Sequence, residues 1–315
     1  MMAFLLIIIP VLFSYASAQQ KQIESMDAEF YYNRGIAYGN RGQYDQAISD
    51  FTKALKIDPR YVRAYYNRGI AYGKKDQYDQ AISDLTKALE IDPKYAAAYY
   101  NRGIAYGNKG QYDQAISDFT KALEIDPKYA AAYYNRGITY GEKGQHDQAI
   151  SDFTKVLKID PRYAGAYNNR GIAYGKKDQY DQAISDFTKA LKINPKFVNA
   201  YYNRGSIFYN KSKYDQAISD FTKVLEIDPR FAMGYNHRGS AYADKGQYDQ
   251  AISDFTKALE ISPKFAGAYY NRGVAYYYKK EYDKSLDDVK KAQNLGYQIS
   301  PKFIETLRKA SGRAN

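Results

Sequence analysis

One tripeptide, Asn-Arg-Gly, recurs at intervals of 34 along this chain of 315 residues. An eighth copy in the same register reads His237-Arg238-Gly239, and the other seven begin at Asn33, Asn67, Asn101, Asn135, Asn169, Asn203 and Asn271. A fixed period of this length indicates a stack of similar units, each burying its apolar face against its neighbours. Such a stack keeps one core along its length, so we expect no domain boundary within it.

Each period predicts a helix, a turn and a second helix. In the third copy, residues 96–129, the turn is predicted at Lys109-Gly110. Helical spacing gives the first helix an inward face of Tyr99, Gly103 and Tyr106, and the second helix an inward face of Ala115, Phe119, Ala122 and Leu123. Gly103 and Ala115 are small, so we expect the two helices to approach closely there.

The ends of the units carry their own signals. Asp126-Pro127 is expected to end one helix and to begin the next, with Asp as the N-cap and Pro at the first helical position. The last copy lacks this pair, and Ser300-Pro301 follows four residues late. Phe303, Ile304 and Leu307 then predict a short amphipathic helix to about Ala310 that caps the core.

The unit resembles the tetratricopeptide repeat. The first copy carries the pattern of that family as Tyr31, Gly35, Tyr38, Gly42, Tyr44, Ala47, Phe51, Ala54 and Pro59. The resemblance covers eight copies, residues 28–61, 62–95, 96–129, 130–163, 164–197, 198–231, 232–265 and 266–299. It implies an all-α fold, a right-handed superhelical α-solenoid of helix-turn-helix repeats whose first helices line a concave groove.

The segments outside the repeats are short. Residues 1–18 contain an apolar run from Ala3 to Phe13 and small residues at Ala16 and Ala18, which is typical of a cleaved secretory signal. The run is too short to span a bilayer. We therefore expect export to the periplasm or the medium, with a retained N-terminal anchor as the alternative. Residues 19–27 form a lead-in, and residues 300–315 the capping helix and a tail.

Two charged residues recur in every copy. Position 7, counted from Ala28, is usually Leu in the family but is here Arg34, Arg68, Arg102, Arg136, Arg170, Arg204, Arg238 and Arg272. Position 23 is Asp50, Asp84, Asp118, Asp152, Asp186, Asp220, Asp254 and Asp288. Position 7 falls on the packing face, where a cation requires a counter-charge. The pattern therefore predicts a structural ladder of Arg–Asp pairs.

Residues able to carry catalysis are scarce. The chain has no Cys and two His, which excludes disulfides and thiolate chemistry. His146 replaces a repeated Tyr and His237 a repeated Asn, almost three repeats apart, so they cannot share a metal ion or a proton relay. We expect no enzyme activity, no metal site and no cofactor.

The resemblance places positions 5 and 6 on the concave groove, which makes them candidates for partner binding. Position 6 is Asn in seven copies, Asn33, Asn67, Asn101, Asn135, Asn169, Asn203 and Asn271, and His237 in the other. Position 5 is mostly Tyr, namely Tyr32, Tyr66, Tyr100, Tyr134, Tyr202 and Tyr270. A row of amides could pair with successive peptide units of an extended chain, and Tyr adds rigid contact area. A structural role for both rows is the alternative.

Basic residues form another row at position 14. They are Arg41, Lys75, Lys109, Lys143, Lys177, Lys211, Lys245 and Lys279, along the turns within the repeats. With a net charge of +11, this basic edge could hold an anionic polymer. Nucleic acid fits an exported protein poorly, whereas an anionic polysaccharide or an acidic protein fits it better.

Three functional hypotheses follow. The first is an exported interaction scaffold that binds an extended peptide or partner segment in its groove. The second is a protein that handles anionic polysaccharide, since similar exported tetratricopeptide proteins serve exopolysaccharide secretion. The third is a structural spacer within an envelope complex.

Overall fold

The computed structural model describes residues 27–312, and all regular structure within this range is α-helical. The predicted signal segment, residues 1–18, lies outside the described residues. None of the described helices combines the length and the apolar composition that crossing a lipid bilayer requires. The chain divides into two compact units, Met1–Asp160 and Pro161–Asn315. Continuity of the stack across residue 160 stays a prediction.

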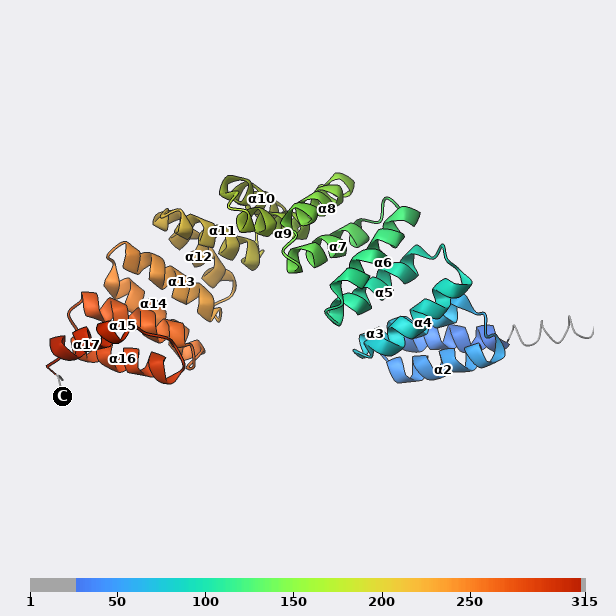
Figure 1. The fold of residues 1–315 in the computed structure, drawn as a ribbon, viewed down its shortest axis with the longest axis horizontal. Coiled ribbons are helices and arrows are strands. Elements are labelled where there is room, and N and C mark those ends of the chain that lie inside the picture. The colour runs from blue at the N-terminus through green and yellow to red at the C-terminus, as the bar shows by residue number, and fades with distance from the viewer. Residues whose placement is uncertain (1–26, 313–315) are drawn as a thin grey trace, which may run out of the picture. The chain divides into compact units, whose positions relative to one another are not determined.

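The first unit is a series of helix pairs. Consecutive helices pack against each other, and the first helices of neighbouring repeats also touch, as α3 touches α5 (Figure 1). This arrangement confirms the predicted helix-turn-helix repeat. Its helices are residues 27–40, α2 (Tyr44–Ile57), α3 (Val62–Lys74), α4 (Tyr78–Ile91), α5 (Ala96–Asn108), α6 (Tyr112–Ile125), α7 (Ala130–Glu142) and α8 (His146–Ile159).

The second unit continues the same pattern and ends in a single helix. Its helices are α9 (Ala164–Lys176), α10 (Tyr180–Ile193), α11 (Val198–Asn210), α12 (Tyr214–Ile227), α13 (Ala232–Asp244), α14 (Tyr248–Ile261), α15 (Ala266–Tyr278), α16 (Tyr282–Asn294) and α17 (Pro301–Ala310). Helix α17 begins with its Pro after Ser300, as predicted. Its Leu307 is fully buried against Leu286 and Val289 of α16, so α17 caps the core.

The buried residues follow the helical spacing read from the sequence. In the third repeat, the inward face of the second helix is buried as predicted, from Ala115 to Leu123. The first helix differs, because its fully buried residues are Ala98, Gly103 and Ala105. The ring of Tyr99 is only partly buried and lies against the core of the next interface, beside Leu123.

Gly103 allows the two helices of its repeat to pack as closely as predicted. A Cβ atom at this position would lie 2.8 Å from Cε1 of Phe119, well inside van der Waals contact. The ring of Phe119 therefore occupies the space that any larger residue at position 103 would need. Gly35 stands in the same relation to Phe51, with a Cβ distance of 2.7 Å.

The turn inside each repeat places position 15 in the left-handed region of the backbone. Glycine fills this position in four repeats, as in Gly110 with φ of 72°. The other four carry Asp76, Asp178, Ser212 and Lys280, with φ between 54° and 63°. Left-handed backbone is unfavourable for most residues with a side chain and is best tolerated by Asn and Asp. These turns are therefore held by the packing of the two helices on either side.

The Asp-Pro pair ends the preceding helix, as predicted, but the prediction that it begins the next helix was wrong. Asp126 is the C-cap of α6, and α7 begins only at Ala130 after Tyr129. The Asp126 carboxylate accepts a hydrogen bond from the backbone N–H of Lys128, 2.9 Å away, and its carbonyl accepts one from that of Tyr129. Asp and Pro thus build a turn between the helices, since Asp bonds the backbone two residues on and Pro presets φ.

The Arg–Asp ladder is confirmed. Arg102 binds Asp118 through two parallel hydrogen bonds, Nε to Oδ2 at 2.7 Å and Nη2 to Oδ1 at 2.8 Å. Its Nη1 donates to the hydroxyl of Thr86 in the preceding repeat, 2.9 Å away. Its guanidinium also lies 5.5 Å from the centre of the Tyr99 ring. One side chain therefore joins the two helices of its own repeat and the repeat before it.

Removing one member of this pair should destabilise the first unit strongly. The side chain of Asp118 is 6% exposed and that of Arg102 is 17% exposed, so Asp118→Ala leaves a largely buried cation without its carboxylate. We expect a loss of about 3–5 kcal/mol in the free energy of unfolding, measured by urea denaturation.

The matched control lies in the same helix. Asp113 pairs with Lys143, but its side chain is 82% exposed, so Asp113→Ala should cost about 0–1 kcal/mol. Equal losses in the two variants would contradict a structural role for the buried ladder.

Candidate functional site

The predicted groove residues lie on the first helices of the repeats. We call the surface formed by positions 5, 6, 9 and 13 of these helices the first-helix surface, and each unit has its own. In the first unit it comprises the helix of residues 27–40 with α3, α5 and α7, and in the second α9, α11, α13 and α15.

The row of Asn at position 6 links neighbouring repeats. The Nδ2 atom of Asn101 donates to the hydroxyl of Tyr66 in the preceding repeat, 3.1 Å away, and to the backbone carbonyl of Ala97 at 2.8 Å. Asn67 and Asn135 make the same bonds, to Tyr32 and Tyr100. The amide nitrogens of these three residues are therefore used within the protein, and only their carbonyl oxygens could contribute a new bond to a ligand.

Asn at position 5 replaces Tyr in two repeats of the second unit without breaking this link. Asn203 donates to Oδ1 of Asn168 at 3.2 Å, and Asn271 donates to Oδ1 of Asn236 at 3.1 Å. An amide oxygen thus serves as the acceptor that a phenol supplies elsewhere. Position 5 and position 6 work as a pair across each of these interfaces.

The Tyr residues at position 5 are packed as well as bonded. The ring centre of Tyr66 lies 4.7 Å from that of Tyr95, and that of Tyr100 lies 4.8 Å from that of Tyr129. Burial raises the pKa of both Tyr95 and Tyr129 to about 12, so these phenols stay neutral at physiological pH. Much of the ring surface that could contact a ligand therefore already contacts other aromatic rings of the protein.

A row of isoleucines at position 9 was not predicted as a binding feature. Ile36, Ile70, Ile104 and Ile138 are partly exposed on the first-helix surface of the first unit, and Ile172 of the second unit is 39% exposed. This row could have been found from the sequence, because position 9 is Ile in each of the first five repeats. These side chains give the first-helix surface an apolar row beside its amides.

The basic edge is neutralised by a row of carboxylates. The Lys75 ammonium pairs with Asp45, which stands at position 18 of the preceding repeat. Lys211 pairs likewise with Asp181, Nζ to Oδ1 at 2.8 Å. The same pairing joins Lys109 to Asp79, Lys143 to Asp113, Lys245 to Asp215 and Lys279 to Asp249. The edge thus alternates in charge, and each of these pairs spans two repeats.

The two histidines belong to different units. His146 is the first residue of α8, in the slot of a repeated Tyr. His237 lies on α13 against Tyr202, with ring centres 5.2 Å apart. Within the described residues, no three or more His, Asp or Glu side chains gather in a way that could hold a metal ion.

His237 is held as a neutral imidazole. Its Nδ1 lies 2.9 Å from the backbone carbonyl of Met233, which requires that nitrogen to carry the proton, and its Nε2 lies 3.3 Å from the hydroxyl of Tyr202. Burial lowers the pKa of His237 below its ordinary value, and the bond to Met233 opposes that shift. His237 therefore takes over the inter-repeat contact that Asn makes elsewhere.

Comparison with protein families gives matches along most of the chain. A model described as tetratricopeptide repeat matches residues 28–61, 62–95, 96–129, 130–163, 164–197 and 198–231. A further model with that description matches residues 221–253, and one described as TPR repeat matches residues 239–280. A comparison with curated protein sequences gives no match.

Solved structures share the fold. The crystal structure of MamA is 34% identical, with 51% of this chain and 95% of that chain covered and a TM-score of 0.50. YrrB, described as a TPR protein with an unusual peptide-binding site, is 28% identical, with coverage of 58% and 95% and a TM-score of 0.50. A repeat protein from Parabacteroides merdae is 23% identical over 91% of this chain and 99% of its own, with a TM-score of 0.53.

The partly buried His237 should make the second unit sensitive to mild acid. Because the pKa of His237 is lower in the folded state than in the unfolded state, where it is about 6.5, protons bind preferentially to the unfolded chain below that pH. Stability is therefore complete above pH 6.5 and decreases as the pH falls toward the folded pKa. We expect His237→Asn, the residue of the other repeats, to show a smaller drop in Tm between pH 7.5 and 5.5 than the wild type.

The other histidine provides the control. His146→Tyr restores the repeated residue at position 17 and should keep the acid-induced drop in Tm of the wild type. An identical drop in all three proteins, followed by circular dichroism, would contradict the assignment to His237.

Proposed function

Because the chain belongs to the tetratricopeptide repeat family, we propose that it is an interaction scaffold that binds an extended segment of a partner protein along its first-helix surface. The observation that carries this proposal is the row of partly exposed isoleucines at position 9, one in each repeat of the first unit. An apolar row on an otherwise polar surface is a common mark of a protein-binding site. We propose a binding role and no catalytic one.

The chemistry of the surface suits a peptide. Isoleucine side chains offer apolar contact, and the Asn oxygens beside them can accept hydrogen bonds from backbone N–H groups. Repetition presents this combination at regular intervals, which matches the repeating backbone of an extended chain. YrrB, the similar protein described as having a peptide-binding site, supports the same class of ligand.

An anionic polysaccharide is the less favoured ligand. The basic edge that would hold it is paired with Asp along both units, as in Lys75 with Asp45 and Lys211 with Asp181. A polymer would have to displace these carboxylates. We therefore treat this ligand, and the role of a pure spacer, as outcomes of the test below.

Replacing the apolar row should weaken peptide binding and leave the fold intact. Peptides selected from a random ten-residue library against the full chain serve as ligands. Ile36→Ser with Ile138→Ser removes two partly exposed side chains, so we expect a loss of about 1–2 kcal/mol, roughly 5- to 30-fold in Kd by calorimetry. Ile125→Ser is the control, because Ile125 is 38% exposed at the end of α6, which is the second helix of its repeat.

Two results would contradict the proposal. If the ligand is an anionic polymer, its binding should weaken steeply with salt, because exposed charges are screened within about 8 Å at physiological ionic strength. Its affinity should also fall in Lys109→Ala. A spacer would select no peptide above background. A peptide held by the isoleucines should keep its affinity within a few-fold between low and high salt.

We also propose that the scaffold acts outside the cytoplasm. The support is the apolar segment from Ala3 to Phe13 followed by Ala16 and Ala18. We expect N-terminal sequencing of the exported protein to begin at Gln19. Recovery of the chain with intact Met1 from a cytoplasmic fraction would contradict export.

A further inference from the structure

Two repeats lack the Phe that the other repeats carry at position 24. Position 24 is Phe in six repeats and Val in the last, but the second repeat carries Leu85. In the third repeat, the ring of Phe119 lies against Gly103, with Cε1 2.8 Å from where a Cβ would stand. Leu85 approaches Gly69 in the same way through its Cγ, at 2.9 Å, but has no ring to extend beyond it.

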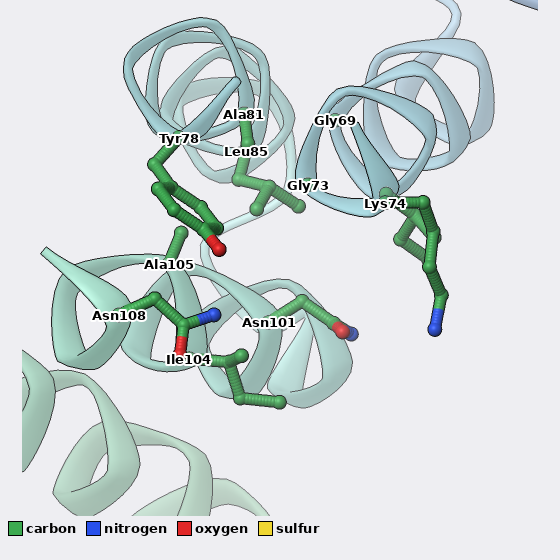
Figure 2. A pocket seen from close by; sticks show the side chains of 11 residues that line it. Gly69, Gly73, Lys74, Tyr78, Ala81, Leu85, Asn101, Ile104, Ala105 and Asn108 are labelled. Atoms are coloured by element: carbon green, nitrogen blue, oxygen red, sulfur yellow. The ribbon is translucent and has the colours of Figure 1, made fainter. Parts of the chain in front are cut away.

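A cavity of about 190 Å³ opens beside Leu85, between α3, α4 and α5. Leu85, Ala81 and Ala105 give it an apolar wall, and Ile70 and Ile104 of the position-9 row border it. Figure 2 shows the Leu85 side chain directed into the space between α3 and α5. The cavity therefore opens onto the first-helix surface where Leu85 replaces the Phe of six other repeats.

The rim of the cavity is polar and carries one positive charge. Asn101, Asn108, Tyr78 and Lys74 contribute to its lining. Asn108 and Lys74, at position 13 of successive first helices, are exposed and lie on different sides of the opening in Figure 2. Among residues 27–312, no carboxylate lies within 4.0 Å of the Lys74 ammonium, unlike the paired lysines of the basic edge.

The size of the cavity selects its occupant. An apolar cavity of about 150 Å³ in a protein core binds benzene, so a phenyl ring fits in about 190 Å³. The polar rim favours an occupant whose ring is attached to hydrogen-bonding groups, as it is in a peptide. The ammonium of Lys74 favours a carboxylate next to that ring.

We propose that this cavity is a specificity pocket that receives one phenylalanine side chain of the bound partner segment, with an acidic residue of that segment beside Lys74. The partner thereby supplies the ring that the second repeat lacks. The proposal rests on the proposed function, and it names the side chain that the first-helix surface selects.

Filling the pocket with a Phe side chain of the protein itself should abolish binding of the partner's phenyl ring. Leu85→Phe restores the residue of six other repeats, so the variant should fold. The probe is the blocked tripeptide acetyl-Glu-Phe-Glu-amide, added to the full chain with labelled Ile methyl groups. We expect chemical-shift changes at Ile104 of the wild type, binding at least about 10-fold weaker when Ala replaces Phe in the probe, and no change at Ile104 in Leu85→Phe.

Transferring the pocket to the next repeat distinguishes ring binding by the pocket from a general effect of the substitutions on folding. Leu85→Phe combined with Phe119→Leu closes the pocket in the second repeat and opens the equivalent space in the third. The shift changes should then move from Ile104 to Ile138. Lys74→Glu should reverse the preference of the wild type for acetyl-Glu-Phe-Glu-amide over acetyl-Lys-Phe-Lys-amide.

The outcomes distinguish this proposal from the one on which it rests. Unchanged binding of the probe to Leu85→Phe, or shift changes that stay at Ile104 in the double variant, would overturn the pocket. Selected ten-residue peptides that remain sensitive to Ile36→Ser and Ile138→Ser would still support the scaffold. Failure of every selected peptide to bind would instead overturn the scaffold.

Discussion

The ion pair between position 7 and position 23 is the interaction on which the other contacts depend. Where the family usually has Leu, Arg102 joins both helices of its repeat through Asp118 and reaches Thr86 of the repeat before it. A largely buried cation is tolerated only with its carboxylate and hydrogen bonds in place. The pair therefore fixes the register of the two helices and of the neighbouring repeat together. The apolar core of Ala and Phe residues alone would specify that register less sharply.

Two further sets of polar contacts cross the same interfaces. Position 6 bonds position 5 of the preceding repeat, as in Asn101 with Tyr66, and position 14 pairs with position 18, as in Lys75 with Asp45. Aromatic rings pack beside these contacts, as in Tyr66 with Tyr95, whose ring centres lie 4.7 Å apart. Because each contact reaches only the adjacent repeat, stability within a unit is approximately a sum over repeats and their interfaces.

The 34-residue period made the fold predictable, but it does not reveal the hydrogen-bond partners of the polar residues repeated in it. The Arg–Asp ladder was predictable because both residues fall on packing faces and carry opposite charges. The Asn row was ambiguous, since an amide that bonds Tyr66 and one that bonds a ligand occupy the same place in a helical pattern. Asp126-Pro127 led to the wrong start for the next helix, because Asp and Pro suit a helix start and a tight turn equally well. Leu85 gave no signal, as replacing one apolar residue by another leaves the pattern intact while its volume changes.

The turns at position 15 have a consequence for how the repeats hold their shape. Asp76 and Lys280 accept left-handed backbone that glycine adopts without strain, so those hairpins carry a conformational cost that Gly110 avoids. In an isolated hairpin such a turn would open more readily than its glycine counterpart. Inside the array, the neighbours keep it closed. Local opening, and with it the first exchange of amide protons with solvent, should therefore concentrate in the second, fifth, sixth and eighth hairpins before it reaches the third.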